Sequence, residues 1–343
     1  MRECLSFDDV LIVPKFSTIT SRKNVNLSSN FLGLNLQLPI ISSNMDTITE
    51  ATMASAMALN GGIGALHRFN SIEQNVNQFK STIGNVFVSI GIGDNEYERA
   101  LALKEAGATH FIIDVAHGAA THVVEMYDRL REILPENCYI VVGNFATGES
   151  IRQFNNHIKS KRKPDAYKCG IGGGSNCSTR VITGCGLPTI ASILDCSTNG
   201  HITIADGGIL NSGDIAKALA AGASMVMIGN LLSGTNETPG EIEWSYDETG
   251  HLVTPGFKKY RGSASKESYE VQGKISEHRT PEGISRMVAC KGPVKDILQQ
   301  LEAGLKSSFT YVGASDMINF RENAELVRTT NSGAIESTPH GDK

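Results

Sequence analysis

The sequence has few of the features that would set a protein apart from the ordinary globular class. Its seven cysteines form an odd-numbered set without a CxxC pair, which argues against a disulfide framework and a zinc site and predicts reduced thiols. No run approaches the roughly 18 apolar residues that span a membrane, and the N-terminus lacks an apolar signal region. We therefore expect a cytoplasmic protein that has no membrane partner.

An excess of charge of either sign is also missing. The chain has 31 Lys and Arg against 36 Asp and Glu, which gives a formal net charge of -5. This balance produces no general attraction to nucleic acid, although a local site can still hold a small anion. Nucleic acid is therefore not an expected partner. With 343 residues, 40% of them hydrophobic, the chain is long enough to bury a large core.

Short apolar runs alternate with helix-compatible stretches along most of the chain. Such runs are typical of parallel strands that are covered by helices. The expected strands are residues 39–43, 62–66, 86–90, 111–115, 139–143, 166–169, 202–205 and 225–228. Eight βα units that close on themselves predict an α/β fold, the (β/α)8 TIM barrel, as a single domain over residues 1–343. A doubly wound sheet is the alternative.

Polar residues and glycines follow directly after these expected strands. They include residues 43–46, 67–68, 114–118, 143–144, 206–208 and 229–230. In a barrel the C-terminal ends of all strands meet at one face, and the loops after strands seven and eight commonly bind phosphate there. This arrangement favours the barrel, and it predicts a phosphorylated small ligand beside Gly207, Gly208, Gly229 and Asn230.

A glycine-rich loop after the sixth strand carries the candidate nucleophile, Cys177. Residues 170–180 are Gly-Ile-Gly-Gly-Gly-Ser-Asn-Cys-Ser-Thr-Arg, and glycines this dense let backbone NH groups approach a ligand closely. The polar setting and Arg180, three residues further on, favour the reactive thiolate. An inert loop cysteine is the plain alternative. The loop is not a dinucleotide fingerprint, because no third glycine opens a helix after it.

The chain departs from the barrel pattern after the eighth strand. Residues 233–286 are polar, have little helical periodicity and contain three prolines. Because a loop this long is usually functional or disordered, we interpret it as a long mobile flap over the barrel mouth, with a solvated excursion as the alternative. Helices are expected from Val294 onward and over residues 318–327. The tail, residues 329–343, is expected to be ordered only where something captures it.

Several motifs in the chain together resemble the IMP dehydrogenase/GMP reductase family. In chain order they are residues 7–15, 44–47, 114–116, 143–144, 177–180, 206–208 and 260–263. The resemblance covers nearly the whole chain. It implies a TIM barrel, usually a homotetramer, in which the loop cysteine attacks C2 of a purine nucleotide while a nicotinamide cofactor gives or takes hydride.

Within that family the sequence is most similar to GMP reductases. Only residues 69–85 lie between the second and third strand motifs, so the inserted regulatory CBS domain of most dehydrogenases is absent. Residues 263–280 lack the Arg-Tyr dipeptide with which dehydrogenases activate water, and residues 277–283 and 310–315 resemble reductase segments. Three features depart from the reductase pattern: Arg68 replaces a lysine, His117 is nearer to some dehydrogenases, and residues 333–340 resemble the dehydrogenase tail that completes a neighbour's potassium site.

The resemblance implies NADPH-dependent reductive deamination of GMP to IMP and ammonia. Cys177 is expected to add to the purine as a thiolate, and Thr179 and Glu282 are expected to move the proton that lets the amine leave. The implied contacts to GMP or IMP are Ser43, Met45, Ser175, Asp206, Gly207, Gly208, Gly229, Asn230, Tyr260, Gly262, Ser263, Ala264, Arg279 and Gly283.

The resemblance also implies residues that hold the cofactor and a cation. The expected NADPH contacts are Arg68, Asp114, Val115, Ala116 and Gly170, with Ser21 and Arg22 from a neighbouring subunit. Carbonyl groups of Gly172, Gly174 and Cys177 are expected to bind K⁺, because uncharged oxygens suit a weakly held hard ion.

Two other functions remain open. An IMP dehydrogenase without a regulatory domain would convert IMP and NAD⁺ to XMP and would need another base, for which Arg279 is the nearest flap arginine. A catalytically silent purine-nucleotide-binding protein would keep the pocket without the chemistry. The presence of Cys177, Thr179 and Glu282 argues against the silent protein.

Overall fold

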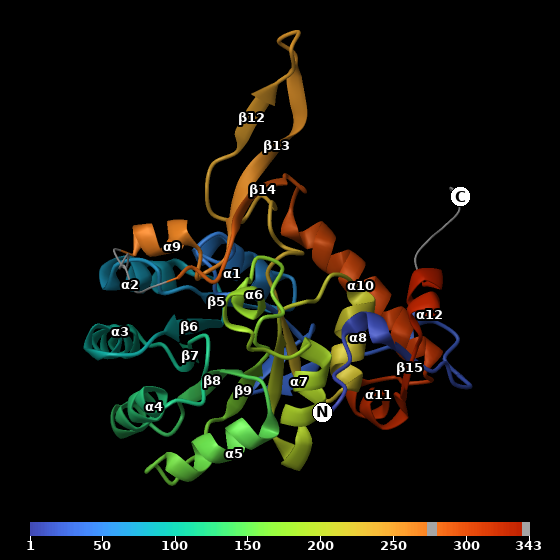
Figure 1. The fold of residues 1–343 in the computed structure, drawn as a ribbon, viewed down its shortest axis with the longest axis horizontal. Coiled ribbons are helices and arrows are strands. Elements are labelled where there is room, and N and C mark those ends of the chain that lie inside the picture. The colour runs from blue at the N-terminus through green and yellow to red at the C-terminus, as the bar shows by residue number, and fades with distance from the viewer. Residues whose placement is uncertain (273–279, 338–343) are drawn as a thin grey trace.

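Eight parallel strands close into a barrel that helices surround (Figure 1). The structure, a computed structural model, describes residues 1–272 and 280–337. The barrel strands are β4 (Ile40–Ser42), β5 (Ile63–Leu66), β6 (Val86–Ile90), β7 (His110–Asp114), β8 (Tyr139–Phe145), β9 (Ala166–Cys169), β10 (Thr203–Asp206) and β11 (Met225–Ile228), and β11 pairs with β4 to close the ring. Each strand lies within two residues of its predicted bounds. The TIM barrel is confirmed.

Helices connect successive strands and cover the outside of the barrel. They are α1 (Ala51–Leu59), α2 (Ile72–Ser81), α3 (Asp94–Glu105), α4 (Thr121–Ile133), α5 (Gly148–His157), α7 (Thr189–Cys196), α8 (Ser212–Ala220) and α10 (Val294–Tyr311). The short helix α6 (Thr179–Thr183) lies in the loop after β9 and has no buried residue. Local sequence explains their bounds and faces. Ser71 and Gln74 form a capping box that starts α2. Along α10 the residues Leu298, Leu301, Leu305 and Phe309 are buried, which is the spacing of one helical face.

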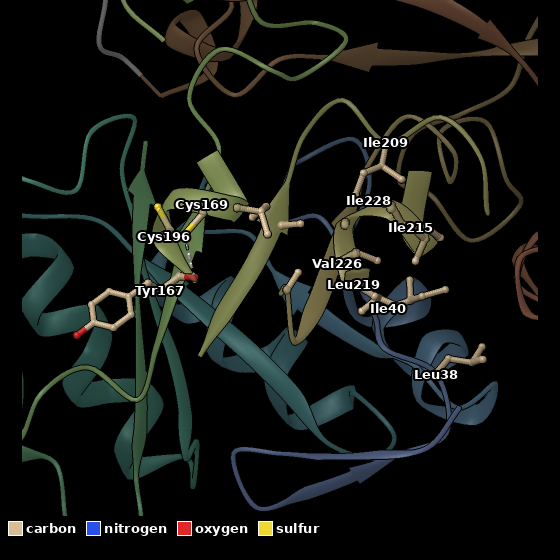
Figure 2. Packing of buried hydrophobic residues seen from close by; sticks show 14 of the residues in the cluster. Leu38, Ile40, Tyr167, Cys169, Cys196, Ile209, Ile215, Leu219, Val226 and Ile228 are labelled. Carbon is tan, nitrogen blue, oxygen red and sulfur yellow. Dashed lines mark hydrogen bonds between the residues drawn. The ribbon is translucent and has the colours of Figure 1, made fainter. Parts of the chain in front are cut away.

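The core has two layers, one inside the barrel and one between its strands and the helices. In the outer layer, Ile40 and Val226 of β4 and β11 lie near Ile215 and Leu219 of α8 (Figure 2). The inner layer is closed at the N-terminal ends of the strands by a hairpin, β2 (Ser29–Phe31) and β3 (Leu34–Leu36), whose apolar side chains join the inward-facing residues of the barrel. The C-terminal face is left open for a site.

Residues 233–286 contain more regular structure than the sequence predicted. Three antiparallel strands, β12 (Glu243–Tyr246), β13 (Leu252–Arg261) and β14 (Ser285–Ala289), form a sheet, and α9 (Lys266–Val271) follows β13. The β12–β13 hairpin projects away from the barrel (Figure 1). Every residue of β12 is exposed, so this strand has no buried face that would produce a long apolar run.

The C-terminal segment also differs from the prediction. The helix expected over residues 318–327 is shorter, because α11 spans Met317–Asn323 and β15 (Leu326–Arg328) pairs antiparallel with β1 (Val10–Ile12). Two short 3-10 helices, η1 (Phe7–Asp9) and η2 (Arg22–Asn24), lie in the N-terminal segment, and α12 (Asn331–Glu336) lies in the tail. Across residues 1–272 and 280–337, none of the helices combines the length and the apolar character needed to cross a membrane.

Candidate active site

A cavity of about 810 Å³ opens at the C-terminal face of the barrel, within the size range of small-molecule sites. Its walls come from loops after barrel strands and from the segment between β13 and β14. The predicted site residues on its walls are Ser43, Met45, Arg68, Asp114, Val115, Ala116, Gly170, Gly172, Gly174, Ser175, Cys177, Thr179, Asp206, Gly207, Tyr260, Gly262, Ser263, Ala264, Glu282 and Gly283. Most of the predicted set therefore meets in one place.

Cys177 lies exposed at the wall of this cavity, in front of α6. Its Sγ is 3.1 Å from Oγ1 of Thr179, and its backbone NH donates to the carbonyl of Gly174 at 3.0 Å. The guanidinium of Arg180, by contrast, donates to the carbonyl of Leu187. Arg180 thus links the cysteine loop to Leu187. The hydroxyl of Thr179 is the polar group that contacts the thiol.

Glu282 reaches the cysteine loop through backbone pairing. The NH of Ser178 donates to the carbonyl of Glu282 at 2.8 Å, and the NH of Ile284 donates to the carbonyl of Asn176 at 2.9 Å. On the other side, the NH of Glu282 donates to the carbonyl of Ala264 at 3.0 Å. Residues 282–284 therefore lie like a short strand between the cysteine loop and the segment after β13, and this places Glu282 in the same cavity as Cys177.

Tyr260 forms a buried corner of the site. Its Oη lies 3.4 Å from Oγ of Ser175, and its backbone carbonyl accepts a hydrogen bond from Nδ2 of Asn176 at 3.1 Å. Burial raises the pKa of the Tyr260 phenol, so the hydroxyl stays protonated and able to donate. A Cβ at Gly229 would lie 3.3 Å from that hydroxyl. This corner, which has two hydroxyl groups and closely approaching backbone, suits an anionic oxygen.

An ion pair anchors the end of β13 to the barrel. Nη2 of Arg261 is 2.6 Å from Oδ2 of Asp46, and both side chains are largely buried. The backbone NH of Arg261 also donates to Oγ1 of Thr47 at 3.2 Å. The residues after β4 thus hold the end of β13, and with it the neighbouring Tyr260, against the barrel.

Lys168 is a cavity residue that the sequence analysis missed. Its Nζ donates to Oδ1 of Asp114 at 2.9 Å, to Oδ2 of Asp206 at 2.7 Å and to Oδ1 of Asn144. Burial alone would lower the pKa of Lys168, but the two carboxylates outweigh burial and hold it above its ordinary value. Burial likewise opposes ionisation of Asp114, yet Lys168 and Arg68 keep its pKa below the ordinary value. The sequence does contain one indication of this role, which is a charged residue within the otherwise apolar strand 166–169.

Arg68 also lies on the cavity wall and contacts Asp114. Its Nη2 donates to the carbonyl of Asp114 at 3.3 Å, and its guanidinium carbon is 4.9 Å from the centre of the Phe69 ring. Nε of Arg68 is buried and has no hydrogen-bond partner among the described residues. His67 points elsewhere: its Nδ1 accepts from the NH of Phe69, and its Nε2 therefore donates to Glu50 at 3.2 Å. This bond to His67 lowers the pKa of Glu50.

Some predicted residues lie off the cavity wall. A Cβ at Gly208 would meet the carbonyl of Gly173, and Oδ1 of Asn230 accepts from Arg286 at 2.6 Å. Ser21 caps η2, which contains Arg22 and contacts α10 on the outside of the barrel. Arg279 is outside the described residues. Wall residues that the sequence analysis did not select are Asn44, Phe69, Ile92, Glu96, Asn144, Lys168, Ile171, Gly173, Asn176, Ile182, Thr183, Tyr269, Gln272 and Thr280.

Nothing in the described ranges resembles a transition-metal centre, since they contain no group of three or more His, Cys, Asp or Glu side chains placed to hold a metal. A donor set of neutral carbonyl groups, such as that expected at Gly172, Gly174 and Cys177, suits only a weakly held ion. The Gly174 carbonyl accepts the NH of Cys177 at 3.0 Å, which leaves its second lone pair for an ion.

Comparisons with known proteins agree with this geometry. Residues 4–340 match the model of the IMP dehydrogenase / GMP reductase domain. The chain is 34% identical over 320 residues to the GMP reductase of Streptococcus agalactiae serotype V, a match that covers 92% of each chain.

Two solved structures extend the comparison. The IMP dehydrogenase of Legionella pneumophila is 42% identical with a TM-score of 0.84, over 96% of this chain and 100% of that one. A GMP reductase variant from Trypanosoma brucei, in complex with guanosine 5'-monophosphate, is 27% identical with a TM-score of 0.87, over 100% and 99% of the two chains. The chain belongs to the IMP dehydrogenase/GMP reductase family, a family of oxidoreductases of purine metabolism that use a nicotinamide cofactor.

Proposed function

We propose that the protein is a GMP reductase, which converts GMP and NADPH to IMP, ammonia and NADP⁺. The observation that carries this proposal is the backbone pairing of residues 282–284 with the cysteine loop, which brings Glu282 into the cavity of Cys177 and Thr179. The Arg-Tyr dipeptide expected of a dehydrogenase is absent from residues 263–280. A site with an acid and no water-activating pair suits release of an amine better than hydrolysis.

The walls of the cavity support a purine nucleotide as substrate, as does the GMP bound to the Trypanosoma brucei enzyme. Asp206 would accept hydrogen bonds from the ribose hydroxyls, and the corner of Ser175 and Tyr260 would hold the phosphate. Backbone groups of residues 262–264 would contact the base. The phosphate site would also include Gly208, Gly229 and Asn230, which lie next to the cavity lining and would support it from outside.

The reaction assigned to these residues begins with addition of the Cys177 thiolate to C2 of the purine. Glu282, through Thr179, delivers a proton to the amino group, because ammonia leaves readily only when it is protonated. Departure of ammonia leaves a thioimidate between Cys177 and C2. NADPH, when bound, supplies the hydride that reduces C2. Cys177 then leaves as the thiolate, which regenerates the enzyme with IMP as product.

The cofactor would lie along the wall formed by Arg68, Asp114, Val115, Ala116 and Gly170. The guanidinium of Arg68 fits an anionic or polar group of a ligand on this wall, because charge-assisted hydrogen bonds are the strong ones. Carbonyl groups of Gly172, Gly174 and Cys177 would bind K⁺. These K⁺ ligands lie on the cysteine loop itself, so the ion would stiffen the segment that carries the nucleophile.

Assembly is part of the same proposal. Ser21 and Arg22 lie in or beside η2 and not on the cavity wall of their own chain. In a homotetramer they would extend the cofactor site of a neighbouring subunit. We propose that the enzyme acts in the cytoplasm, where both nucleotides and NADPH are present.

The alternative reaction is IMP dehydrogenase activity, with IMP and NAD⁺ as substrates and XMP as product. It is favoured by the 42% identity to the Legionella pneumophila structure. The tail segment 333–340, which would complete a neighbour's cation site, lies partly outside the described residues.

Product analysis distinguishes the two reactions. The purified protein is incubated with GMP and NADPH, and nucleotides and ammonia are quantified after chromatography. The proposal predicts IMP and ammonia in equal amounts. Absence of both products, together with formation of XMP from IMP and NAD⁺, would refute it.

A further inference from the structure

The ammonium group of Lys168 connects three strands of the barrel at the floor of the cavity. It has three N–H donors, and it directs them to Asp114 at the end of β7, Asn144 in β8 and Asp206 at the end of β10. The Lys168 side chain is only 3% exposed. Every donor of this lysine is therefore used, and its position is determined from three sides.

The same contacts determine how the carboxylate of Asp206 is oriented. Its Oδ2 accepts from Nζ of Lys168 at 2.7 Å and from Nδ2 of Asn144 at 2.9 Å. Within residues 1–272 and 280–337 the contacts of this carboxylate all use Oδ2, and the side chain remains 20% exposed at the cavity wall. Oδ1 is thus the oxygen that stays available to a ligand.

An ionised carboxylate that presents one oxygen to a cavity is a good acceptor for hydroxyl groups, and such charge-assisted hydrogen bonds are the strong ones. Lys168 is needed for that state. Without it, Asp114 and Asp206 would be two neighbouring carboxylates with no shared cation, and one of them would tend to take up a proton or turn away.

We infer that Lys168 is a positioning residue that holds Asp206 to bind the vicinal hydroxyl groups of a ribose, so that the site selects ribonucleotides over 2'-deoxyribonucleotides. The inference rests on the proposed nucleotide substrate and assigns the basis of its sugar selectivity. Lys168 acts through Asp206 and does not itself contact the reacting atoms. Lys168 also positions Asp114, which lines the proposed cofactor wall. Loss of Lys168 therefore disturbs both the proposed cofactor wall and the proposed ribose site at Asp206.

The test compares binding of GMP and 2'-deoxy-GMP by calorimetry in the wild type and in Lys168→Met. A charged hydrogen bond to the 2'-hydroxyl predicts that the wild type prefers GMP by about 10- to 100-fold. Lys168→Met should bring this ratio close to one. The matched control is Lys258→Met, which removes another buried ammonium, one that donates to the carbonyls of Thr235, Asn236 and Thr238 away from the cavity wall. This control should keep the wild-type ratio.

An unchanged ratio in Lys168→Met, or a wild type without ribose preference, would overturn the inference. If Lys168→Met does not fold, Lys168→Gln provides the second measurement, because it removes the charge but keeps a polar side chain that can donate hydrogen bonds. A wild-type ratio in Lys168→Gln would also overturn it. Binding is measured with IMP and 2'-deoxy-IMP as well. Ribose preference for both bases, with turnover of IMP alone, would refute the proposed reaction and leave the inference standing.

Discussion

Gly283 is the point at which a single added methyl group tests the placement of Glu282. A Cβ at this position would lie 3.1 Å from the backbone N of Ser265, 3.2 Å from the carbonyl oxygen of Asn176 and 3.3 Å from the carbonyl carbon of Ala264. All three atoms belong to backbone, so no side chain can rotate away. To reach ordinary contact distances the two flanking segments must separate by a few tenths of an ångström.

The expected cost follows from that displacement. Overpacking a close contact costs about 1–3 kcal/mol, which would lower thermal stability modestly without preventing folding. Since a misplacement of about 1 Å can cost about 100-fold in rate, a shift of a few tenths of an ångström should lower kcat/KM for GMP roughly tenfold. The loss should appear mainly in kcat, because Glu282 acts on the leaving amine.

The assay is steady-state oxidation of NADPH by Gly283→Ala at saturating GMP, with thermal unfolding measured in parallel. The control is Ile284→Ala at the adjacent, 52% exposed side chain, which trims the surface and leaves the backbone spacing unchanged. A Gly283→Ala enzyme with the kcat of the wild type would show that the pairing of residues 282–284 does not position the acid.

Three further perturbations test separate parts of the account. Cys177→Ala should abolish turnover and leave GMP affinity within a few-fold of the wild type by calorimetry; retained turnover would exclude covalent catalysis. Arg261→Met should destabilise the protein by about 3–5 kcal/mol in urea unfolding, because it leaves Asp46 buried without its cation; a change below about 1 kcal/mol would show that the pair is solvent-screened. Asp114 has a lowered folded-state pKa, so its stabilisation exists above its ordinary value of 3.8 and is lost as the pH falls through the folded value. Lys168 has a raised folded-state pKa, so its stabilisation is complete below 10.5 and is lost as the pH rises further. The free energy of unfolding of the wild type minus that of Lys168→Met should therefore rise as the pH increases above 3.8, because the variant's unpaired carboxylates resist ionisation, and it should shrink above 10.5. A difference that stays constant from acid to neutral pH would contradict the ion-pair assignment.

The barrel could be predicted from the sequence because each of its strands is an apolar run of its own. Val86–Ile90 and Met225–Ile228 are buried throughout, so no alternation is needed to recognise them. A strand that forms only through pairing with a segment far away in the sequence need not have a recognisable local sequence pattern. The strand Leu326–Arg328 exists because it pairs with Val10–Ile12, and its residues taken alone fit the end of a helix equally well.

The β12–β13 hairpin was missed for a different reason. Its residues are polar overall, so the average composition of the segment indicates a loop. Ile242, Trp244 and Tyr246 nevertheless alternate with polar residues, and Asp247 and Gly250 follow at a turn. That alternation is the usual signature of a strand. A search for long apolar runs finds the buried strands of the barrel and overlooks an exposed hairpin.

The candidate site was predictable where its chemistry depends on a residue type in a short motif. Cys177, Thr179 and Glu282 were selected in this way, and all line one cavity. Lys168 was not, because its role depends on partners from β7, β8 and β10 that only the closed barrel brings together. The hydrogen bond from Arg180 to the carbonyl of Leu187 could not be predicted from the short motif either, because the acceptor lies outside that motif.

The most direct test of the central claim follows the absorbance of the reduced nicotinamide in two mixtures, one with GMP and NADPH and one with IMP, NAD⁺ and K⁺. Wild type and Glu282→Gln are measured in both. We expect the absorbance to fall with GMP and NADPH in the wild type, Glu282→Gln to lose this activity, and neither protein to produce a rise with IMP and NAD⁺. A rise with IMP and NAD⁺, or full reductase activity in Glu282→Gln, would contradict that claim.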